Sequence, residues 1–311
     1  MLAQEESTLK RKKRIGREEI CGTLFAFLPL LGFVLFTIVP VSIAFATMFT
    51  SMQGNNLSTM EWNNFENFKT VFTDKIFWGS FLTSIIMIIP HFLGLLLSLV
   101  ISAILAQKLP GSKVFKTLFF IPYVCSSVAV AIMWQWMFEV NYGIINTVLG
   151  GLFGEGAKVA WMTKAVPFRT MLIIVMVWQA PGYGIVMFSA AFTGVNQSLY
   201  EAAQLDGAGK FRQFFSITLP SISPTIYYLI TTGLLAGLQT FDIVRIFAGD
   251  SWTGAAGPSN AGLTTVLDIY NQGVFKGMPV ASVMSFVFFI FIFTIMQVNK
   301  KLSKRWVHEG Y

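Results

Sequence analysis

Charge is what this sequence has least of. Only 12% of its 311 residues are charged, whereas an average soluble domain carries about a quarter. Apolar side chains make up 54% of the chain, and 31 residues are phenylalanine. This number of charged side chains is too small to cover the surface of a water-soluble protein. The composition therefore excludes an ordinary water-soluble enzyme. It predicts an integral membrane protein whose outer surface faces lipid.

Cysteine and histidine are also scarce. Cys21 and Cys125 lie far apart in sequence, so no disulfide framework is indicated, and we expect both to be small buried apolar side chains. His91 follows Pro90 inside an apolar stretch. We expect it to be a hydrogen-bonded residue at a helix contact rather than a proton relay. No clustered set of metal ligands is present, so we predict no metal site.

Motifs for nucleotide and hydrolytic chemistry are missing as well. The chain has no G-x-x-x-x-G-K-[ST] phosphate loop, and no H-E-x-x-H, C-x-x-C or G-x-S-x-G motif. We therefore expect that the chain does not bind ATP in that way, that it is not itself an enzyme, and that it binds no cofactor of its own.

What the sequence does have is long apolar runs. Six are long enough to cross a bilayer, which takes about 20 residues. Each should be helical, because lipid offers the backbone amides no other hydrogen-bonding partner. The predicted spans are Leu24–Phe49, Phe77–Ala106, Thr117–Phe138, Thr170–Phe192, Ser221–Phe247 and Val280–Val298.

Lysine and arginine are unevenly divided between the loops that these spans create. With the N-terminus inside the cell, fifteen of the 22 lie on the inner side and seven on the outer side. Because inner loops carry the excess of positive charge, both termini and the loop at 196–220 are predicted to be cytoplasmic. The basic run at 10–14 lacks interleaved aromatic residues, so it indicates topology, and we expect no nucleic-acid partner.

The loop between the fourth and fifth spans has helix signals of its own. Ser198 and Glu201 have the S-x-x-E spacing of a capping box, which predicts that a helix starts at Ser198. Gly207 and Gly209 should end that helix. A second short helix should follow and end at Pro220. Its apolar face would consist of Phe211, Phe214, Phe215 and Thr218.

This loop resembles the EAA loop of the permease subunits of binding-protein-dependent ABC importers. Glu201-Ala202-Ala203 leads to Gly207, and Ile217-Thr218-Leu219-Pro220 follows at the spacing of the family pattern. In that family the loop docks in a cleft of a separate ATPase, so the resemblance implies a coupling role. The alternative is an interfacial helix pair that only connects two spans. The implied coupling residues are Glu201, Ala202, Ala203, Asp206, Gly207, Ala208, Leu219 and Pro220.

Other stretches extend the resemblance over most of the chain. Leu118–Tyr123 and Phe241–Val244 resemble the carbohydrate and glycerol-phosphate permeases of this group. Gly257-Pro258 matches a G-G-P region of the family, although Ala256 replaces the first glycine and an insertion at about Asp250–Ala255 lengthens that loop. The resemblance is therefore to the branch of importers that carries oligosaccharides and glycerol phosphate.

The resemblance implies an all-α integral membrane fold, with six transmembrane helices of the ABC importer permease type and a cytoplasmic EAA coupling helix-turn-helix. Residues 1–19 would be a cytoplasmic basic segment, 20–300 the permease domain with its coupling loop at 196–220, and 301–311 a cytoplasmic tail. The implied function is ATP-driven import of a carbohydrate, such as an oligosaccharide, across the inner membrane of a bacterium. The implied partners are a second homologous permease, two ATP-binding subunits that carry ATP and magnesium, an extracellular solute-binding protein and membrane lipid.

In that family the sugar binds near the membrane midplane, between the spans on either side of the coupling loop. Sugar recognition needs hydrogen-bonding groups that match hydroxyls, together with an aromatic face. The predicted pocket residues are Gln179, Ala180, Tyr183, Gly233, Ala236, Gly237, Thr240 and Asp242. For the small residues among them, close helix packing is the alternative. Further candidates by side-chain chemistry, with structural contacts as the alternative, are Gln135, Asn146, Gln239, Trp134 and Trp178.

Several alternatives stay open at this point. Asp242 and Arg245 form either a pair on one helix face or a contact for an anionic or hydroxylated substrate. The solute could be another compound such as glycerol phosphate. An ion-coupled secondary transporter would need ligands for a coupling ion or paired repeats with broken helices, and membrane carboxylates are few here. A membrane-embedded enzyme would need clustered His, Asp or Glu residues in the spans, which the sequence lacks.

Overall fold

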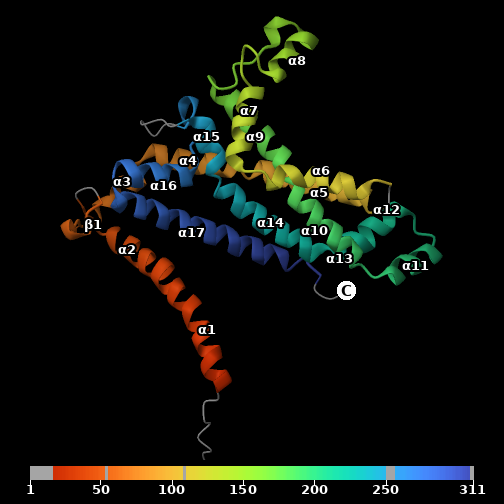
Figure 1. Ribbon diagram of the computed structural model, residues 1–311, viewed down its shortest axis with the longest axis horizontal. Helices are drawn as coiled ribbons and strands as arrows, with labels where there is room; N and C mark the ends of the chain where they lie inside the picture. Colours follow the sequence, from red (N-terminus) through yellow and green to blue (C-terminus); the bar gives the residue numbers. More distant parts are fainter. Residues whose placement is uncertain (1–16, 53–54, 108–109, 250–255, 309–311) are drawn as a thin grey trace, which may run out of the picture.

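The fold comes from a computed structural model, and it is mostly helical. The long helices lie roughly side by side, with α11 and α12 at one end of the bundle and α3 and β1 at the other (Figure 1). The predicted basic run at 10–14 and the insertion at 250–255 lie outside the residues that the structure describes. Those residues are 17–52, 55–107, 110–249 and 256–308.

The apolar runs form the spanning helices. Within the described residues, five helices are long and apolar enough to cross a membrane, or six if the bent pair α6–α7 counts as one span. Their bounds lie within a few residues of the predicted ones. The elements are α1 (Arg17–Phe33), η1 (Val34–Ile38), α2 (Val39–Thr47), α4 (Lys75–Ile86), α5 (Ile89–Leu105), α6 (Ser112–Val124), α7 (Ser127–Met137), α9 (Ala165–Gln179), α10 (Pro181–Thr193), α14 (Ser223–Leu238), α15 (Asp242–Ala248) and α17 (Met278–Ser303).

Short elements make the connections between these helices. The two strands pair antiparallel, with Thr50 opposite Trp62. The connecting elements are β1 (Thr50–Ser51), η2 (Leu57–Thr59), β2 (Glu61–Trp62), α3 (Glu66–Thr73), α8 (Ile144–Phe153), η3 (Glu155–Ala157), α11 (Gln197–Leu205), α12 (Lys210–Gln213), η4 (Phe214–Thr218), α13 (Leu219–Ser221), η5 (Pro258–Asn260) and α16 (Thr265–Phe275).

The third predicted span is broken rather than continuous. Helices α6 and α7 meet at an angle of 95°. The backbone is extended at Cys125 (ψ 143°) and Ser126 (ψ 130°), which ends one helix and begins the next. Pro122, inside the last turn of α6, has no N–H to give the helix. The break brings Ser127, the first residue of α7, to the wall of the cavity described below.

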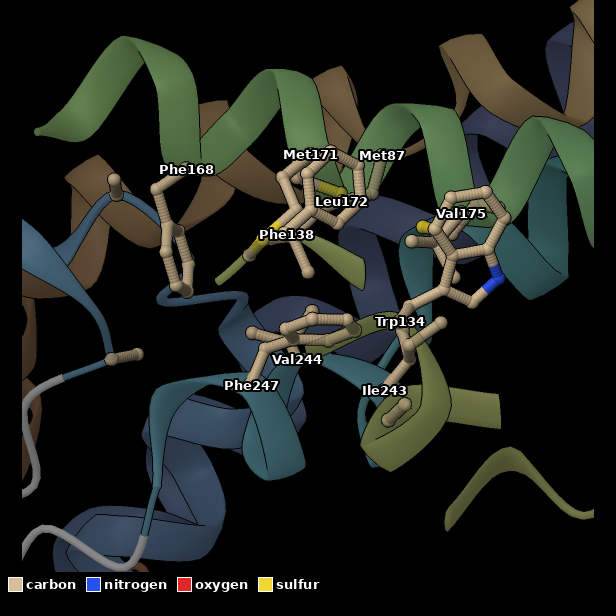
Figure 2. Close-up of a cluster of buried hydrophobic side chains, with 14 of the residues drawn as sticks. Met87, Trp134, Phe138, Phe168, Met171, Leu172, Val175, Ile243, Val244 and Phe247 are labelled. Atoms are coloured by element: carbon tan, nitrogen blue, oxygen red, sulfur yellow. The ribbon is translucent and has the colours of Figure 1, made fainter. Parts of the chain in front are cut away.

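Side chains from α7, α9 and α15 form a buried apolar cluster. Phe168, Met171 and Leu172 on α9 point toward Val244 and Phe247 on α15 (Figure 2). All five are 5% exposed or less. Burial of such side chains stabilises a contact by about 1.5–3 kcal/mol each where water is the alternative. The cluster holds the end of α9 and the start of α15 on two sides of the cavity described below.

The first span is packed differently from the others. None of the residues in the most apolar part of Cys21–Thr47 is buried, and α1 extends away from the other helices (Figure 1). Near its end, the Thr47 hydroxyl lies 3.0 Å from that of Ser282 on α17.

The two cysteines are both free and both exposed. The prediction that they are buried is therefore wrong. Cys21 lies on α1, which leaves its apolar surface uncovered, and Cys125 lies at the end of α6, where the backbone turns away from the helix.

Candidate functional site

The first arm of the 196–220 loop is helix α11. Its N-cap is Asn196, whose Oδ1 accepts hydrogen bonds from the Ser198 backbone N–H (3.0 Å) and the Ser198 hydroxyl (2.9 Å). The helix starts at Gln197, one residue before the predicted start at Ser198. The predicted capping box is wrong, because the Ser198 hydroxyl donates to the asparagine instead of accepting from a backbone amide. Glu201, the other half of the predicted box, is exposed on the helix surface.

A left-handed glycine ends α11, as the sequence predicted. Gly207 has φ +75°. The backbone N–H groups of Gly207 and Ala208 donate to the carbonyls of Gln204 (3.0 Å) and Ala203 (2.8 Å), which is the Schellman pattern. Gly209 has φ −66°, which any residue adopts. The turn therefore requires the first glycine and not the second.

The second arm runs through α12, the π turn η4 and α13 as one helical segment. Pro220 lies inside α13 and does not end the arm, so that prediction is wrong. In the π turn, the Leu219 N–H donates to the Phe214 carbonyl, five residues back. The regular pattern of helical hydrogen bonds is thus already interrupted where proline lacks its donor.

The two arms of the loop are joined by side chains. The Tyr200 hydroxyl lies 2.7 Å from the Thr218 hydroxyl. The Gln213 amide donates to the Ala208 carbonyl over 2.7 Å. These bonds connect α11 and the turn to the second arm, so the loop is a braced unit.

The outer side of the loop carries apolar side chains that this chain leaves uncovered. Leu205 is 89% exposed, Phe211 83% and Phe215 58%, and we call these three the apolar tip. Exposed apolar groups of this kind are typical of a surface that contacts another protein or lipid. Of the predicted coupling residues, Glu201, Ala202, Asp206 and Gly207 are exposed, and Ala203, Ala208, Leu219 and Pro220 are half-buried.

A second candidate site is a cavity of about 710 Å³ inside the bundle, a size typical of small-molecule sites. Its walls come from α5, α6, α7, α9, α10, α14 and α15, so distant parts of the sequence converge on it. The predicted pocket residues on its wall are Gln179, Ala180, Tyr183, Gly233, Ala236, Thr240 and Asp242.

Gly237 is the predicted pocket residue that does not line this cavity. A Cβ atom at Gly237 would stand 2.7 Å from the Ile88 Cα and 2.9 Å from the Met87 carbonyl oxygen. Only glycine allows α14 to lie so close to the turn between α4 and α5. Gly237 is therefore a packing position, as the alternative in the sequence analysis proposed.

Three tyrosines form one side of the cavity. The Tyr183 and Tyr228 hydroxyls lie 3.0 Å apart, and the ring of Tyr123 stacks on that of Tyr183 with centroids 5.4 Å apart. Tyr123 and Tyr228 also line the cavity and were not predicted to. Tyr228 lies one helical turn before Thr232, which also lines the cavity, but it is not on the face of α14 that Gly233 and Ala236 share, so their spacing gave no signal for it.

His91 is a further cavity residue that the sequence analysis missed. It lies in the first turn of α5 and lines the cavity beside Gly233. Its Nε2 is buried and has no hydrogen-bond partner among the described residues. The expectation of a hydrogen-bonded residue at a helix contact is therefore wrong for this nitrogen.

Several polar candidates serve the fold instead. The Gln135 amide donates to the Ile246 carbonyl (2.9 Å) and joins α7 to α15. Asn146 donates to the Val159 carbonyl (2.9 Å) and accepts from the Trp161 indole N–H (3.0 Å). Trp134 is buried in the core cluster, where its ring meets that of Trp178 edge to face, whereas Gln239 lines the cavity.

The side chains of Asp242 and Arg245 lie in different environments. The Asp242 carboxylate is exposed at the cavity wall, at the first residue of α15. The Arg245 guanidinium lies over the rings of Tyr270 (4.5 Å) and Phe241 (5.7 Å), a favourable cation–π arrangement.

Comparison with known proteins decides the family. Residues 94–308 match the family described as binding-protein-dependent transport system inner membrane component. The chain belongs to that family. It is therefore an inner-membrane permease of a transport system that works with a binding protein, and its helices have the fold expected of such permeases. This membership sets aside the ion-coupled secondary transporter and the membrane-embedded enzyme.

Several relatives of this permease have been named. The probable ABC transporter permease protein YesP of Bacillus subtilis is 30% identical over 315 residues, which cover 99% of this chain and 98% of the relative. The lactose transport system permease protein LacF of Rhizobium radiobacter is 31% identical over 74% of this chain and 76% of its own. The sn-glycerol-3-phosphate transport system permease protein UgpA of Yersinia pestis is 32% identical over 71% of this chain and 72% of its own.

Solved structures share the fold. A chain of a bacterial ABC transporter that imports the acidic polysaccharide alginate superposes with a TM-score of 0.76 at 22% identity, covering 92% of this permease and 96% of that chain. The same comparison with an alginate transporter in complex with an alginate pentasaccharide-bound periplasmic protein gives a TM-score of 0.77 at 20% identity. At this identity the likeness concerns the fold alone.

Proposed function

We propose that this permease is one half of the translocation path of an ATP-driven carbohydrate importer. Two observations support a sugar as the solute. One relative is a lactose transport system permease, and the cavity is lined by three tyrosines and by hydrogen-bonding side chains. The second half of the path comes from a homologous permease. An external solute-binding protein delivers the sugar, and two ATP-binding subunits carry ATP and magnesium, none of which this chain binds itself.

The observation that carries the coupling role is the apolar tip beside the turn at Gly207. A turn that exposes Leu205, Phe211 and Phe215 next to polar helix ends is suited to insertion into a groove on a partner. The excess of lysine and arginine on the same side of the membrane supports a cytoplasmic position for this loop and both termini. ATP-driven closure of the ATPases then pushes the braced loop, which rocks the helices between inward-open and outward-open states.

The glycines of the turn test this role. Gly207→Val puts a β-branched residue at φ +75°, which distorts the turn. Gly209→Val is the matched control, because Gly209 has an ordinary φ and nothing within 4 Å of its missing Cβ. We expect the first variant to lose co-purification with the ATPase and ATP-driven uptake, and the second to keep both.

The test also has an outcome that contradicts the proposal. If Gly207→Val leaves the assembled complex and its uptake at the wild-type level, the loop does not transmit the stroke. Labelling of a single cysteine introduced at exposed Asp206 by a membrane-impermeant reagent from outside the cell would contradict the proposed orientation.

A further inference from the structure

Four cations lie together where the last spanning helix ends. Lys300 and Lys301 belong to the last turn of α17, and Lys304 and Arg305 follow that turn directly; we call these four the basic end. All four side chains are exposed, and none forms an ion pair with another residue in the part of the chain that the structure describes. The sequence from 278 to 308 contains no aspartate or glutamate. The basic end is therefore a concentrated positive charge without a counter-ion nearby in the sequence.

The length of α17 places the basic end at a membrane surface. The helix begins at Met278, whose backbone N–H donates to Oδ1 of Asn55, in the connection between β1 and η2, over 3.0 Å. Lys300 lies 22 residues further along, which is about 33 Å of α-helix. The hydrocarbon core of a bilayer is about 30 Å thick. A helix that enters the bilayer near Met278 thus leaves it at Lys300, among the lipid headgroups.

The face of α17 that carries two of these lysines also carries exposed apolar rings. Lys304 lies four residues after Lys300, and Phe293 lies seven residues before it, so the three share one face of the helix. Phe289, one turn earlier, stacks on Phe293 with ring centroids 6.1 Å apart. The two rings are 61% and 53% exposed. At the depth of the hydrocarbon core they suit contact with acyl chains, so the lysines continue a lipid-facing surface.

Hydrogen bonds on both sides of the basic end fix it to the bundle. Before it, the Asn299 amide donates to the Thr231 hydroxyl on α14 over 2.8 Å. After it, the His308 backbone N–H donates to the Ser223 hydroxyl at the start of α14 over 2.9 Å. The four cations are therefore held close together before any ligand arrives. Binding an anion then costs less conformational entropy than it would on a free chain end.

Positive charge beside a lipid-facing apolar surface matches one class of ligand. We propose that the basic end binds the phosphate headgroup of an anionic phospholipid, phosphatidylglycerol, while one acyl chain lies along Phe293 and Phe289. The Arg305 guanidinium suits two phosphate oxygens at once, and the lysines act as point charges. Each cation near an anionic lipid surface strengthens binding roughly fivefold. The site is separate from the solute cavity and from the 196–220 loop, so it does not depend on the proposed carbohydrate function.

Lipid binding to the assembled transporter tests the proposal. The complex of both permeases with the ATPases is titrated with phosphatidylglycerol or with phosphatidylcholine of the same acyl chains, and bound lipid is counted by native mass spectrometry. A phosphatidylglycerol with a photoreactive headgroup then locates the site. We expect it to crosslink within residues 297–308, and phosphatidylglycerol to bind there at least roughly tenfold more tightly than phosphatidylcholine.

Charge variants separate the cluster from net charge. Lys300→Gln combined with Lys304→Gln should weaken phosphatidylglycerol binding by roughly tenfold or more, whereas Lys300→Arg combined with Lys304→Arg should keep it. The matched control is Lys69→Gln combined with Lys164→Gln, which removes the same charge from two exposed lysines on separate segments of the chain. The control should bind the lipid like the wild type, and all three variants should give the wild-type yield of complex.

Other results overturn the inference. Equal binding of the two lipids, or crosslinks that lie elsewhere, would show that the basic end is not a lipid site. An equal loss in the control would show that only net charge matters. Release of the ATPases by the Lys300→Gln and Lys304→Gln variant would show that the basic end contacts a protein surface instead. If soluble glycerophosphoglycerol competes as well as the intact lipid, the site takes a free phosphodiester and the apolar rings have no part in it.

Discussion

The hydroxyl groups of Tyr200 and Thr218 lie 2.7 Å apart and join the two arms of the 196–220 loop. Tyr200 belongs to α11, and Thr218 is the last residue of the π turn, 8% exposed. A loop that transmits force must resist bending at its tip. This contact and the bond from Gln213 to the Ala208 carbonyl supply that resistance across the Gly207 turn.

Removing the brace should uncouple ATP hydrolysis from uptake. Tyr200→Phe and Thr218→Val each delete one hydroxyl of the pair, which costs about 1 kcal/mol. We expect fewer sugars imported per ATP in proteoliposomes, with the complex still assembled. The double variant should be no worse than either single one, because both delete the same contact. Additive losses would show that the two hydroxyls act independently.

The core cluster predicts where the fold is most sensitive. Leu172 on α9 is completely buried, whereas Leu96 on α5 is 59% exposed. Leu172→Ala should destabilise the protein by about 2–5 kcal/mol, because it leaves a cavity between α9 and α15. Leu96→Ala, the control, should have little effect. Thermal aggregation of the detergent-solubilised complex measures both, and equal midpoints would contradict the packing.

The two small residues of α14 should separate packing from binding. Gly237→Ala places a methyl group 2.7 Å from the Ile88 Cα, and such overpacking costs about 1–3 kcal/mol. Gly233→Ala places one 3.5 Å from the His91 Cβ, an ordinary contact at the cavity wall. We expect the first to lower the yield of folded complex. The second should keep the yield and change the KM for uptake, and a fall in its yield would contradict the ordinary contact that a methyl group makes at Gly233.

Asp268 predicts a pH dependence of stability. It lies on α16, outside the spanning helices, is 4% exposed, and its Oδ2 has no partner among the described residues. Burial, and to a smaller extent repulsion from Asp74, raises the pKa of Asp268 from 3.8 to about 6. Attraction to Lys276 acts in the opposite direction but is the smallest of the three effects. The folded chain thus holds this proton more tightly than the unfolded chain, so stability falls as the pH rises from about 4 to about 6 and stays lower above that range.

The measurement for Asp268 is the thermal midpoint of the complex at pH 5 and pH 7.5. The wild type should be more stable at pH 5 by this contribution. Asp268→Asn keeps the shape of the protonated acid, so its thermal midpoint should differ little between the two pH values. At pH 7.5 the variant should be more stable than the wild type. Asp206→Asn, an exposed carboxylate, is the control. A larger loss for Asp268→Asn at pH 7.5 than at pH 5 would show that the carboxylate is stabilising.

Local signals in the sequence predicted the elements that depend on local chemistry. The spans follow from apolar length, and the turn at Gly207 follows from the left-handed backbone that glycine permits. The start of α11 was predicted to within one residue, but its cap was not, because Asn196, two residues before Ser198, is itself a strong N-cap that was passed over. Pro220 failed because the π turn before it accommodates a missing donor, and no residue pattern announced that turn.

The cavity depended on contacts between distant segments. Tyr183 and Gly233 were placed near a pocket by resemblance, and the structure puts both on one wall. His91 and Tyr123 reach the same wall only because α5 and the α6–α7 break pack against α10 and α14. Hydropathy predicted the Thr117–Phe138 run as a single span, because a bend in the backbone at Cys125 changes neither the length nor the apolar character of that run.

The scarcity of cysteine has a practical consequence. The native sequence offers two free, accessible thiols, Cys21 on the first span and Cys125 at the break in the third. Spin labels on both would give one interresidue distance without any engineered substitution, provided that the partner subunits are free of reactive thiols. Recording that distance with and without ATP would measure how far the unpacked first helix moves relative to the bent third span during the transport cycle.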